Sequence, residues 1–304
     1  MNIKEIMPFI AMGAMLIAVQ IAAVLLSPLM NEAGYTAFEN PEAIENIMYF
    51  LAILFVFTAA LLLLIKYKGK KMLSWIIAAS VFLVFLYIFA AVLGKILGVT
   101  LYAAALTAVL SLLSMLLLYR YPEWYVIDTL GILICAGAAS IFGISLEIFP
   151  VIVLLVLLAA YDAVSVYKTK HMLTLADGII NTKAPILVVI PKSRKYSYIK
   201  EGFELQKEKS ERGAFMMGMG DLIMPSILVV SSYIWLDAPH LPIGISLPTL
   251  TASIGSLAGL GVLLYFVSKG NPQAGLPTLN GGVILGFLFG CALSDSWGWL
   301  SGIL

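Results

Sequence analysis

The chain has few charged residues and very few of the residue types that form disulfides or bind metal ions. Charged residues make up 12% of its 304 residues, whereas 62% are hydrophobic. Soluble globular domains are about 45–50% apolar, so this composition excludes that class. The two cysteines, Cys135 and Cys291, both lie in apolar segments and have no metal-ligand spacing. Two such residues provide neither a disulfide framework nor a cysteine-based metal site.

Histidine is equally scarce. The chain contains only His171 and His240, and neither belongs to the HExxH pattern that a zinc peptidase carries on a helix. Both lie in predicted loops, so no histidine is available within the membrane to activate a serine nucleophile. We therefore predict that the protein uses no metal and no cofactor.

Apolar runs of about 18 or more residues recur along the whole chain, as in multi-spanning helical membrane proteins. We predict an all-α polytopic fold and one membrane domain, residues 1–304. Spans 1–6 lie within 1–167, a cytoplasmic loop covers 168–213, and spans 7–9 lie within 214–304. The nine predicted transmembrane helices are Pro8–Met30, Ile47–Ile65, Met72–Val99, Leu101–Tyr119, Tyr125–Leu146, Ile148–Tyr167, Ala214–Leu236, Leu247–Ser268 and Thr278–Ile303.

The distribution of Lys and Arg predicts the orientation. With nine spans and the N-terminus in the cytoplasm, 17 of the 18 basic residues fall on the cytoplasmic side, ten of them between Lys168 and Arg212. The exception is Lys95, at the outer end of the third span. The first external loop carries four glutamates and no basic residue. The positive-inside rule therefore places the N-terminus in the cytoplasm and the C-terminus outside.

Two aspartates, Asp162 and Asp221, lie inside long apolar segments. A carboxylate at membrane depth costs roughly 2.5–3.5 kcal/mol on insertion scales, so such residues are usually functional. Both are predicted roughly 9–10 Å below the cytoplasmic interface, at 1.5 Å per helical residue, on the antiparallel sixth and seventh spans. Asp128 and Asp295 lie nearer to the ends of their spans, and we interpret them as interfacial carboxylates.

The residues around the two aspartates are small or conformationally unusual. Gly218 and Gly220 precede Asp221, and glycine lets another backbone or a ligand approach closely. Tyr161 adjoins Asp162, and its phenol either fills space or forms a hydrogen bond. The segment Ala274–Pro277 opens the ninth span, and Pro277 removes a backbone donor there. Ordinary helix packing and a proline-started helix are the alternative explanations.

These motifs resemble those of the presenilin and signal peptide peptidase family. Tyr161-Asp162 is similar to the YD motif of these intramembrane aspartyl proteases, and Gly218–Asp221 is similar to their GxGD motif. Family members have nine transmembrane helices, with the aspartates on the sixth and seventh. Their Pro-Ala-Leu motif opens the ninth helix. The corresponding residues here are Ala274, Gly275, Leu276 and Pro277, which keep the Leu and the Pro after it but not the first Pro-Ala. The resemblance covers essentially the whole chain and is closest to microbial presenilin homologues.

The resemblance implies an aspartic endopeptidase that hydrolyses peptide bonds within transmembrane segments, with Asp162 and Asp221 as the catalytic pair. The predicted orientation matches presenilins, which implies single-span substrates with the N-terminus outside. The expected partners are these substrates and the lipid bilayer, with a possible homo-oligomer, no nucleic acid and no evident accessory subunit. The expected location is a membrane, as an integral multi-pass protein; for a microbial protein this is the cell membrane.

A short β-branched segment, Ile186–Ile190, lies between Pro185 and Pro191 in the loop between the aspartates. It is too short to span a membrane, and we predict a strand that pairs with an unwound substrate. Two other functions are compatible with the buried carboxylates: a proton- or cation-coupled transporter using Asp162 and Asp221, or a non-catalytic assembly subunit. No inverted repeat supports the transporter.

Overall fold

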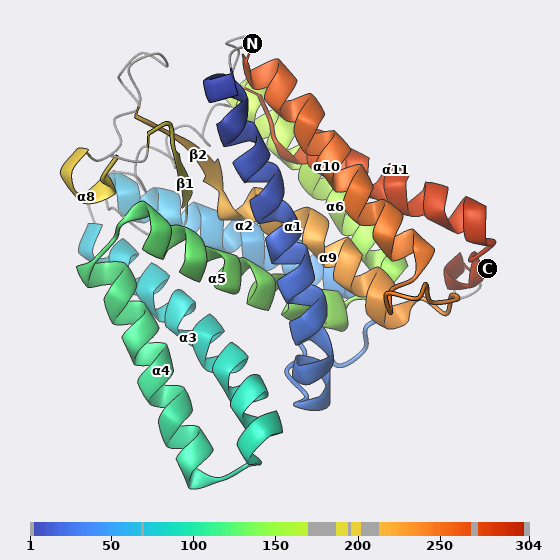
Figure 1. Cartoon of the computed structure of the whole chain (residues 1–304), viewed down its shortest axis with the longest axis horizontal. Helices are drawn as coiled ribbons and strands as arrows, with labels where there is room; N and C mark the ends of the chain where they lie inside the picture. Colours follow the sequence, from blue (N-terminus) through green and yellow to red (C-terminus); the bar gives the residue numbers. More distant parts are fainter. Residues whose placement is uncertain are drawn as a thin grey trace.

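The structure is a computed structural model, which describes residues 3–67, 70–169, 187–193, 196–201, 213–268 and 273–300. It is mostly helical, as predicted (Figure 1). The elements are α1 (Ile3–Glu32), α2 (Glu45–Lys66), α3 (Lys70–Leu97), α4 (Leu101–Arg120), α5 (Trp124–Ser145), α6 (Ile148–Val164), a π-helical turn η1 (Ser165–Thr169), β1 (Leu187–Pro191), α8 (Tyr198–Glu201), β2 (Ala214–Gly218), α9 (Met219–Trp235), α10 (Leu247–Ser268), α11 (Leu276–Ser294) and a 3-10 turn η2 (Gly298–Leu300).

Within the described part of the chain, eight helices are long and apolar enough to cross a membrane. The segment that corresponds to the predicted seventh span, α9, is apolar but has only 17 residues. At 1.5 Å per residue α9 is about 25 Å long, a little less than a hydrocarbon core of about 30 Å. The last helix, α11, ends at Ser294 rather than near Ile303, because Asp295 at its C-cap has a left-handed backbone with φ 51°.

The prediction that the seventh helix begins at Ala214 is wrong for its first five residues. Ala214–Gly218 forms strand β2, which pairs antiparallel with β1, so that Leu187 lies opposite Gly218 and Pro191 opposite Ala214. Glycine is a poor helix former, and pairing with β1 offers these residues a ladder of hydrogen bonds. The helix therefore starts only at Met219.

Helix α5 is the most buried span and α2 the least. In the most apolar window of α5, 56% of the residues are buried, compared with 6% in α2. Helix α5 packs against α1, α9 and β1, whereas α2 has few neighbours apart from α3 and α6. Most of the α2 surface is therefore left to the lipid. Figure 1 shows α3 and α4 as an antiparallel pair at one side, and the two strands near the N-terminal end of α1.

Small and polar residues hold the helices together, as expected within a membrane, where apolar contact alone does not favour helix association. Gln20 on α1 donates to the hydroxyl of Ser256 on α10 over 2.8 Å. Ser140 on α5 donates to the carbonyl of Ala23 on α1 over 2.9 Å. These buried bonds fix the position of α1 between α5 and α10.

Candidate active site

The two aspartates come from consecutive membrane helices that pack against each other. Asp162 lies near the C-terminal end of α6 and is buried, with 5% of its surface exposed. Asp221 is the third residue of α9 and is half-buried. The Asp162 carboxyl group is close enough to interact electrostatically with Asp221. The sequence placed Asp221 about seven residues into a helix, whereas the preceding residues form β2.

A single turn of backbone at the start of α11 contacts both aspartates. The amide of Leu276 donates a hydrogen bond to Oδ2 of Asp162 over 3.1 Å. The adjacent residue, Gly275, lies against the other carboxylate, since a Cβ atom at this position would be 3.1 Å from Oδ1 of Asp221. The segment Ala274–Pro277, predicted to shape the site, therefore lies beside both carboxyl groups. A side chain at position 275 would crowd Asp221.

The other predicted site residues lie around this pair. The ring of Tyr161 contacts Phe55 of α2 edge-on, with ring centroids 5.3 Å apart. Gly218 is the N-cap of α9, and a Cβ there would lie 3.6 Å from Oδ2 of Asp221, an ordinary contact. A Cβ at Gly220 would meet no described atom within 4 Å. The close approach at the site therefore involves Gly275 more than the glycines of the GxGD motif.

Three contacts of the site were not predicted. The hydroxyl of Tyr167 on η1 donates to Oε1 of Gln273 over 2.7 Å and accepts the amide of Ala274 at 3.4 Å. The buried amide side chain of Asn280 on α11 donates to the carbonyl of Leu155 on α6 over 2.9 Å. All three contacts hold α11 and the residues before it against α6 and η1. The only sequence signal was the presence of polar side chains next to the YD and Leu-Pro motifs.

The strand predicted for Ile186–Ile190 is confirmed over residues 187–190 and extends to Pro191, while Ile186 lies outside the described residues. Its partner strand is β2, which leads directly into α9 and Asp221. The opposite side of β1 is covered by α5, where Oδ1 of Asp128 accepts the amide of Val189 at 2.9 Å. The interpretation of Asp128 as a merely interfacial carboxylate therefore missed this bond.

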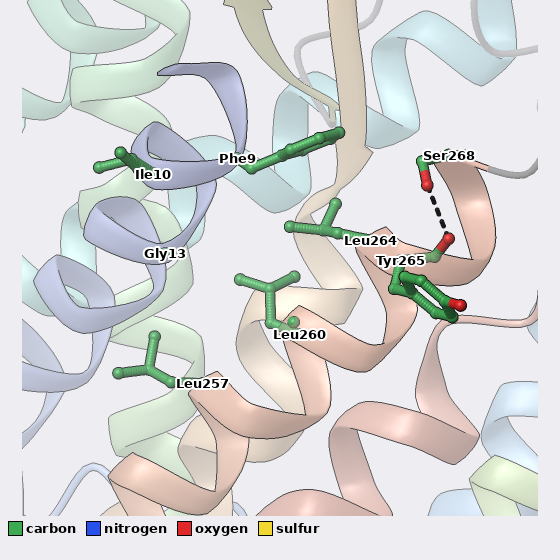
Figure 2. A pocket seen from close by; sticks show the side chains of 9 residues that line it. Phe9, Ile10, Gly13, Leu257, Leu260, Leu264, Tyr265 and Ser268 are labelled. Carbon is green, nitrogen blue, oxygen red and sulfur yellow. Dashed lines mark hydrogen bonds between the residues drawn. The ribbon is translucent and has the colours of Figure 1, made fainter. Parts of the chain in front are cut away.

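Two hollows lie elsewhere among the described residues. An apolar groove of about 380 Å³ lies between α1 and α10 (Figure 2), where Phe9 faces Leu257, Leu260 and Leu264. Its lining contains no carboxylate, so it does not qualify as a hydrolytic site. A second cavity of about 540 Å³ lies at the opposite ends of α6 and α9 from the aspartates and includes Glu147 and Asp237. In the described part of the chain, no three His, Cys, Asp or Glu residues gather as metal ligands would.

Two carboxyl groups within a membrane domain, beside a backbone donor, are compatible with an aspartyl protease of the intramembrane type. The family model for signal-peptide peptidase and presenilin aspartyl protease matches residues 13–295, and the chain belongs to this family. It is therefore an integral, multi-pass aspartic endopeptidase.

Solved structures agree with this assignment. The chain is 48% identical to a presenilin family intramembrane aspartate protease solved in space group C222, with a TM-score of 0.71, covering 94% of this chain and 99% of that one. For a presenilin family protease in space group P2 the identity is also 48% and the TM-score 0.69, covering 93% and 97%. No match was found among curated protein sequences.

The contact between Gly275 and Asp221 leads to a testable expectation. Gly275→Ala should lower the cleavage rate about tenfold, because the added methyl group displaces the Asp221 carboxylate by a few tenths of an ångström. Gly281→Ala on the same helix is the control, since a Cβ there meets no described atom within 4 Å. The measurement is the initial rate of cleavage in detergent. Equal rates for the two variants would contradict the crowding argument.

Proposed function

We propose that Asp162 and Asp221 are the catalytic pair and that they hydrolyse a peptide bond by activating one water molecule. The observation that carries the proposal is the contact of two consecutive residues, Gly275 and Leu276, with the two carboxyl groups. Both carboxyl groups therefore lie beside one short backbone segment. Two carboxyl groups this close share a single proton, because ionising both is costly.

In the proposed reaction, the ionised carboxylate takes a proton from water while the water oxygen attacks the scissile carbonyl carbon. The protonated carboxyl group donates a hydrogen bond to the carbonyl oxygen, which becomes the oxyanion of a tetrahedral intermediate. That intermediate collapses as the C–N bond breaks, and a carboxyl group gives its proton to the leaving nitrogen. The two products are a new carboxyl end and a new amino end, and one water molecule is consumed.

We further propose nine membrane crossings, with α9 as the seventh, the N-terminus and both strands on the cytoplasmic side and the C-terminus outside. The lysine and arginine distribution supports this orientation. Most of the basic loop that it relies on, 168–213, lies outside the described residues. A single-span substrate with its N-terminus outside would then present its cytoplasmic end to the side of the domain that carries the strands and both aspartates.

Hydrolysis requires an extended substrate, because a helix keeps its carbonyl groups hydrogen-bonded. The sequence predicts that Ile186–Ile190 pairs with the substrate, but one edge of β1 pairs with β2 and the other faces α5. We propose instead that the unwound segment pairs with β2. Since the amide of Val189 points to Asp128 instead of to β2, the pair Val189 and Met216 is of the non-hydrogen-bonded kind. The amide of Met216 therefore points away from β1, toward the outer edge of the two-stranded sheet. This edge ends at Gly218, directly before Met219, where the helix bearing Asp221 begins.

Strand pairing is tested by Met216→Pro, which removes an outward amide without removing a donor from the β1–β2 ladder. We expect cleavage to fall about tenfold or more, the usual effect of losing one hydrogen bond to substrate. Met216→Leu keeps the amide and controls for the side chain. If Met216→Pro cleaves as fast as Met216→Leu, the substrate does not use this edge.

The proposed function is tested by reconstituting the protein with a single-span substrate whose N-terminus is outside and identifying the products by mass spectrometry. We expect two fragments cut within the membrane segment by the parent protein and none by the Asp162→Ala or Asp221→Ala variants. Product from both folded variants would refute the assignment of the catalytic pair.

A further inference from the structure

Asp128 is a half-buried acidic residue that the proposed chemistry does not use. It lies in the second turn of α5, in a helix that otherwise carries apolar and small residues. Its Oδ1 accepts the backbone amide of Val189 at 2.9 Å. A buried backbone donor costs free energy when it is left without a partner, so this acceptor stabilises β1 in its observed position.

This hydrogen bond lies at the centre of β1, so it can fix the position of the whole strand. Val189 is the central residue of β1 and only 1% exposed. One edge of β1 pairs with β2, and Asp128 takes up the amide at the centre of the other edge. The hydrogen bond therefore fixes the register of β1 along α5. A shift of β1 by one residue along its own direction would break the bond.

The same helix also binds the segment that follows β1 in the chain. The carboxylate of Glu123, the N-cap of α5, accepts the hydroxyl of Ser197 at 2.6 Å and the amide of Tyr198 at 3.1 Å. Two carboxylates one helical turn and a half apart thus bind backbone before and after the residues 194–195. Helix α5 is also the most buried span, so it is a rigid support for both.

The position of β1 also determines the position of Asp221 on α9, because β2 connects the two. Val189 lies opposite Met216, and β2 continues without a break into Gly218, Met219 and Asp221. Met219 is itself held by α5, because its carbonyl accepts a weak hydrogen bond from the thiol of Cys135 at 3.8 Å. The register of β1 along α5 therefore determines where the outer edge of β2 and the first turn of α9 lie.

We propose that Asp128 is a positioning residue that anchors β1 to α5 and so sets the register in which an extended substrate meets the two aspartates. This inference rests on the proposed function, because it assigns a role in substrate placement. It adds to that function a residue on a third helix, outside the motifs that resemble those of the family. Its action passes through Val189 and β2, without contact with the reacting atoms.

The experiment compares Asp128→Ala, which removes the acceptor, with Asp128→Asn, which keeps a carbonyl oxygen at the same place. Thr129→Ala, at an exposed neighbouring position on α5, is the control. Hydrogen–deuterium exchange of a peptide covering 187–193 reports the anchor directly and does not need activity. We expect exchange in Asp128→Ala to be at least about tenfold faster than in the parent, in Asp128→Asn within about threefold, and in Thr129→Ala unchanged.

The kinetic part separates positioning from general damage. Asp128→Ala should raise KM about tenfold and spread the cleavage over neighbouring bonds, while Asp128→Asn restores most of both. Unchanged exchange in Asp128→Ala, unchanged cleavage despite faster exchange, or failure of Asp128→Asn to rescue would each overturn the proposal. If Asp128→Ala does not fold, Val189→Pro removes the donor instead and should give the same exchange, KM and cleavage-site changes. Normal values in that variant would overturn the proposal as well.

The two proposals can fail separately. If the parent protein cleaves no single-span substrate, the proposed function fails, while the exchange measurement still decides whether Asp128 anchors β1. If the parent cleaves and the Asp128 variants behave like Thr129→Ala, the catalytic pair stands and the positioning role does not.

Discussion

Replacing Asp162 or Asp221 by alanine is expected to abolish cleavage, with a loss of about 10⁴-fold or more in kcat, and the double variant should be no worse than either single one. In the proposed mechanism the two carboxyl groups act as a unit on one water molecule, so removing one leaves the other with no partner to complete the proton transfer. Residues that act as a unit show strongly non-additive losses for this reason. Single-turnover cleavage of a reconstituted substrate measures the effect.

The matched control is Asp237→Ala. Asp237 follows α9, the helix that carries Asp221, but it is exposed and lies beyond the other end of that helix. Its removal should leave cleavage within about twofold of the parent, since exposed charges far from a site contribute little. Thermal unfolding followed by circular dichroism should confirm that all variants are folded. Additive losses for Asp162→Ala and Asp221→Ala would contradict a shared mechanism.

The second large effect is expected at the contact between α10 and α11. Gly255→Ala should lower the free energy of unfolding by about 1–3 kcal/mol, the usual cost of overpacking, and reduce cleavage at the same time. A Cβ at Gly255 would run into the carbonyl oxygen of Gly282 and would lie 2.8 Å from the Cα of Gly286. Backbone atoms cannot rotate away as a side chain can, so the two helices must move apart. Close packing through small residues is common between membrane helices.

The loss of cleavage follows from the position of α11. The first residues of this helix supply Gly275 beside Asp221 and the Leu276 amide bound to Asp162. A shift of α11 away from α10 therefore disturbs both aspartates. Gly261→Ala on α10 is the control, because a Cβ there meets no described atom within 4 Å. Its thermal midpoint and its cleavage rate should equal those of the parent, and a similar loss in both variants would contradict the packing argument.

The hydrogen bond between Leu276 and Asp162 also bears on how the Leu-Pro motif works. Proline at position 277 follows the donor directly and has no amide of its own to compete for the carboxylate. The motif places one free amide at the N-terminal end of a helix, where donors have no intrahelical partner. The departure from the Pro-Ala-Leu pattern at Ala274 and Gly275 leaves this donor in place.

The sequence by itself determined the class of protein, the approximate limits of most helices and the two residues at the centre of the site. Apolar runs long enough to span a bilayer are local properties of the chain, so α10 begins and ends at the predicted residues, Leu247 and Ser268. The cost of a charge at membrane depth singled out Asp162 and Asp221 without any structure. The spacing of the YD and GxGD motifs then indicated the family.

Only the tertiary structure decided how these elements meet. Ala214–Gly218 is apolar enough for a membrane helix, and it becomes a strand because β1, separated from it by more than twenty residues, offers a paired edge. Gly275 and Leu276 reach both aspartates because α11 packs on α6 and α9, and Asp128 binds Val189 because β1 packs on α5. Such contacts depend on distances between segments far apart in the chain. Hydropathy and motif spacing contain no information about those distances, so the sequence alone could not predict these contacts.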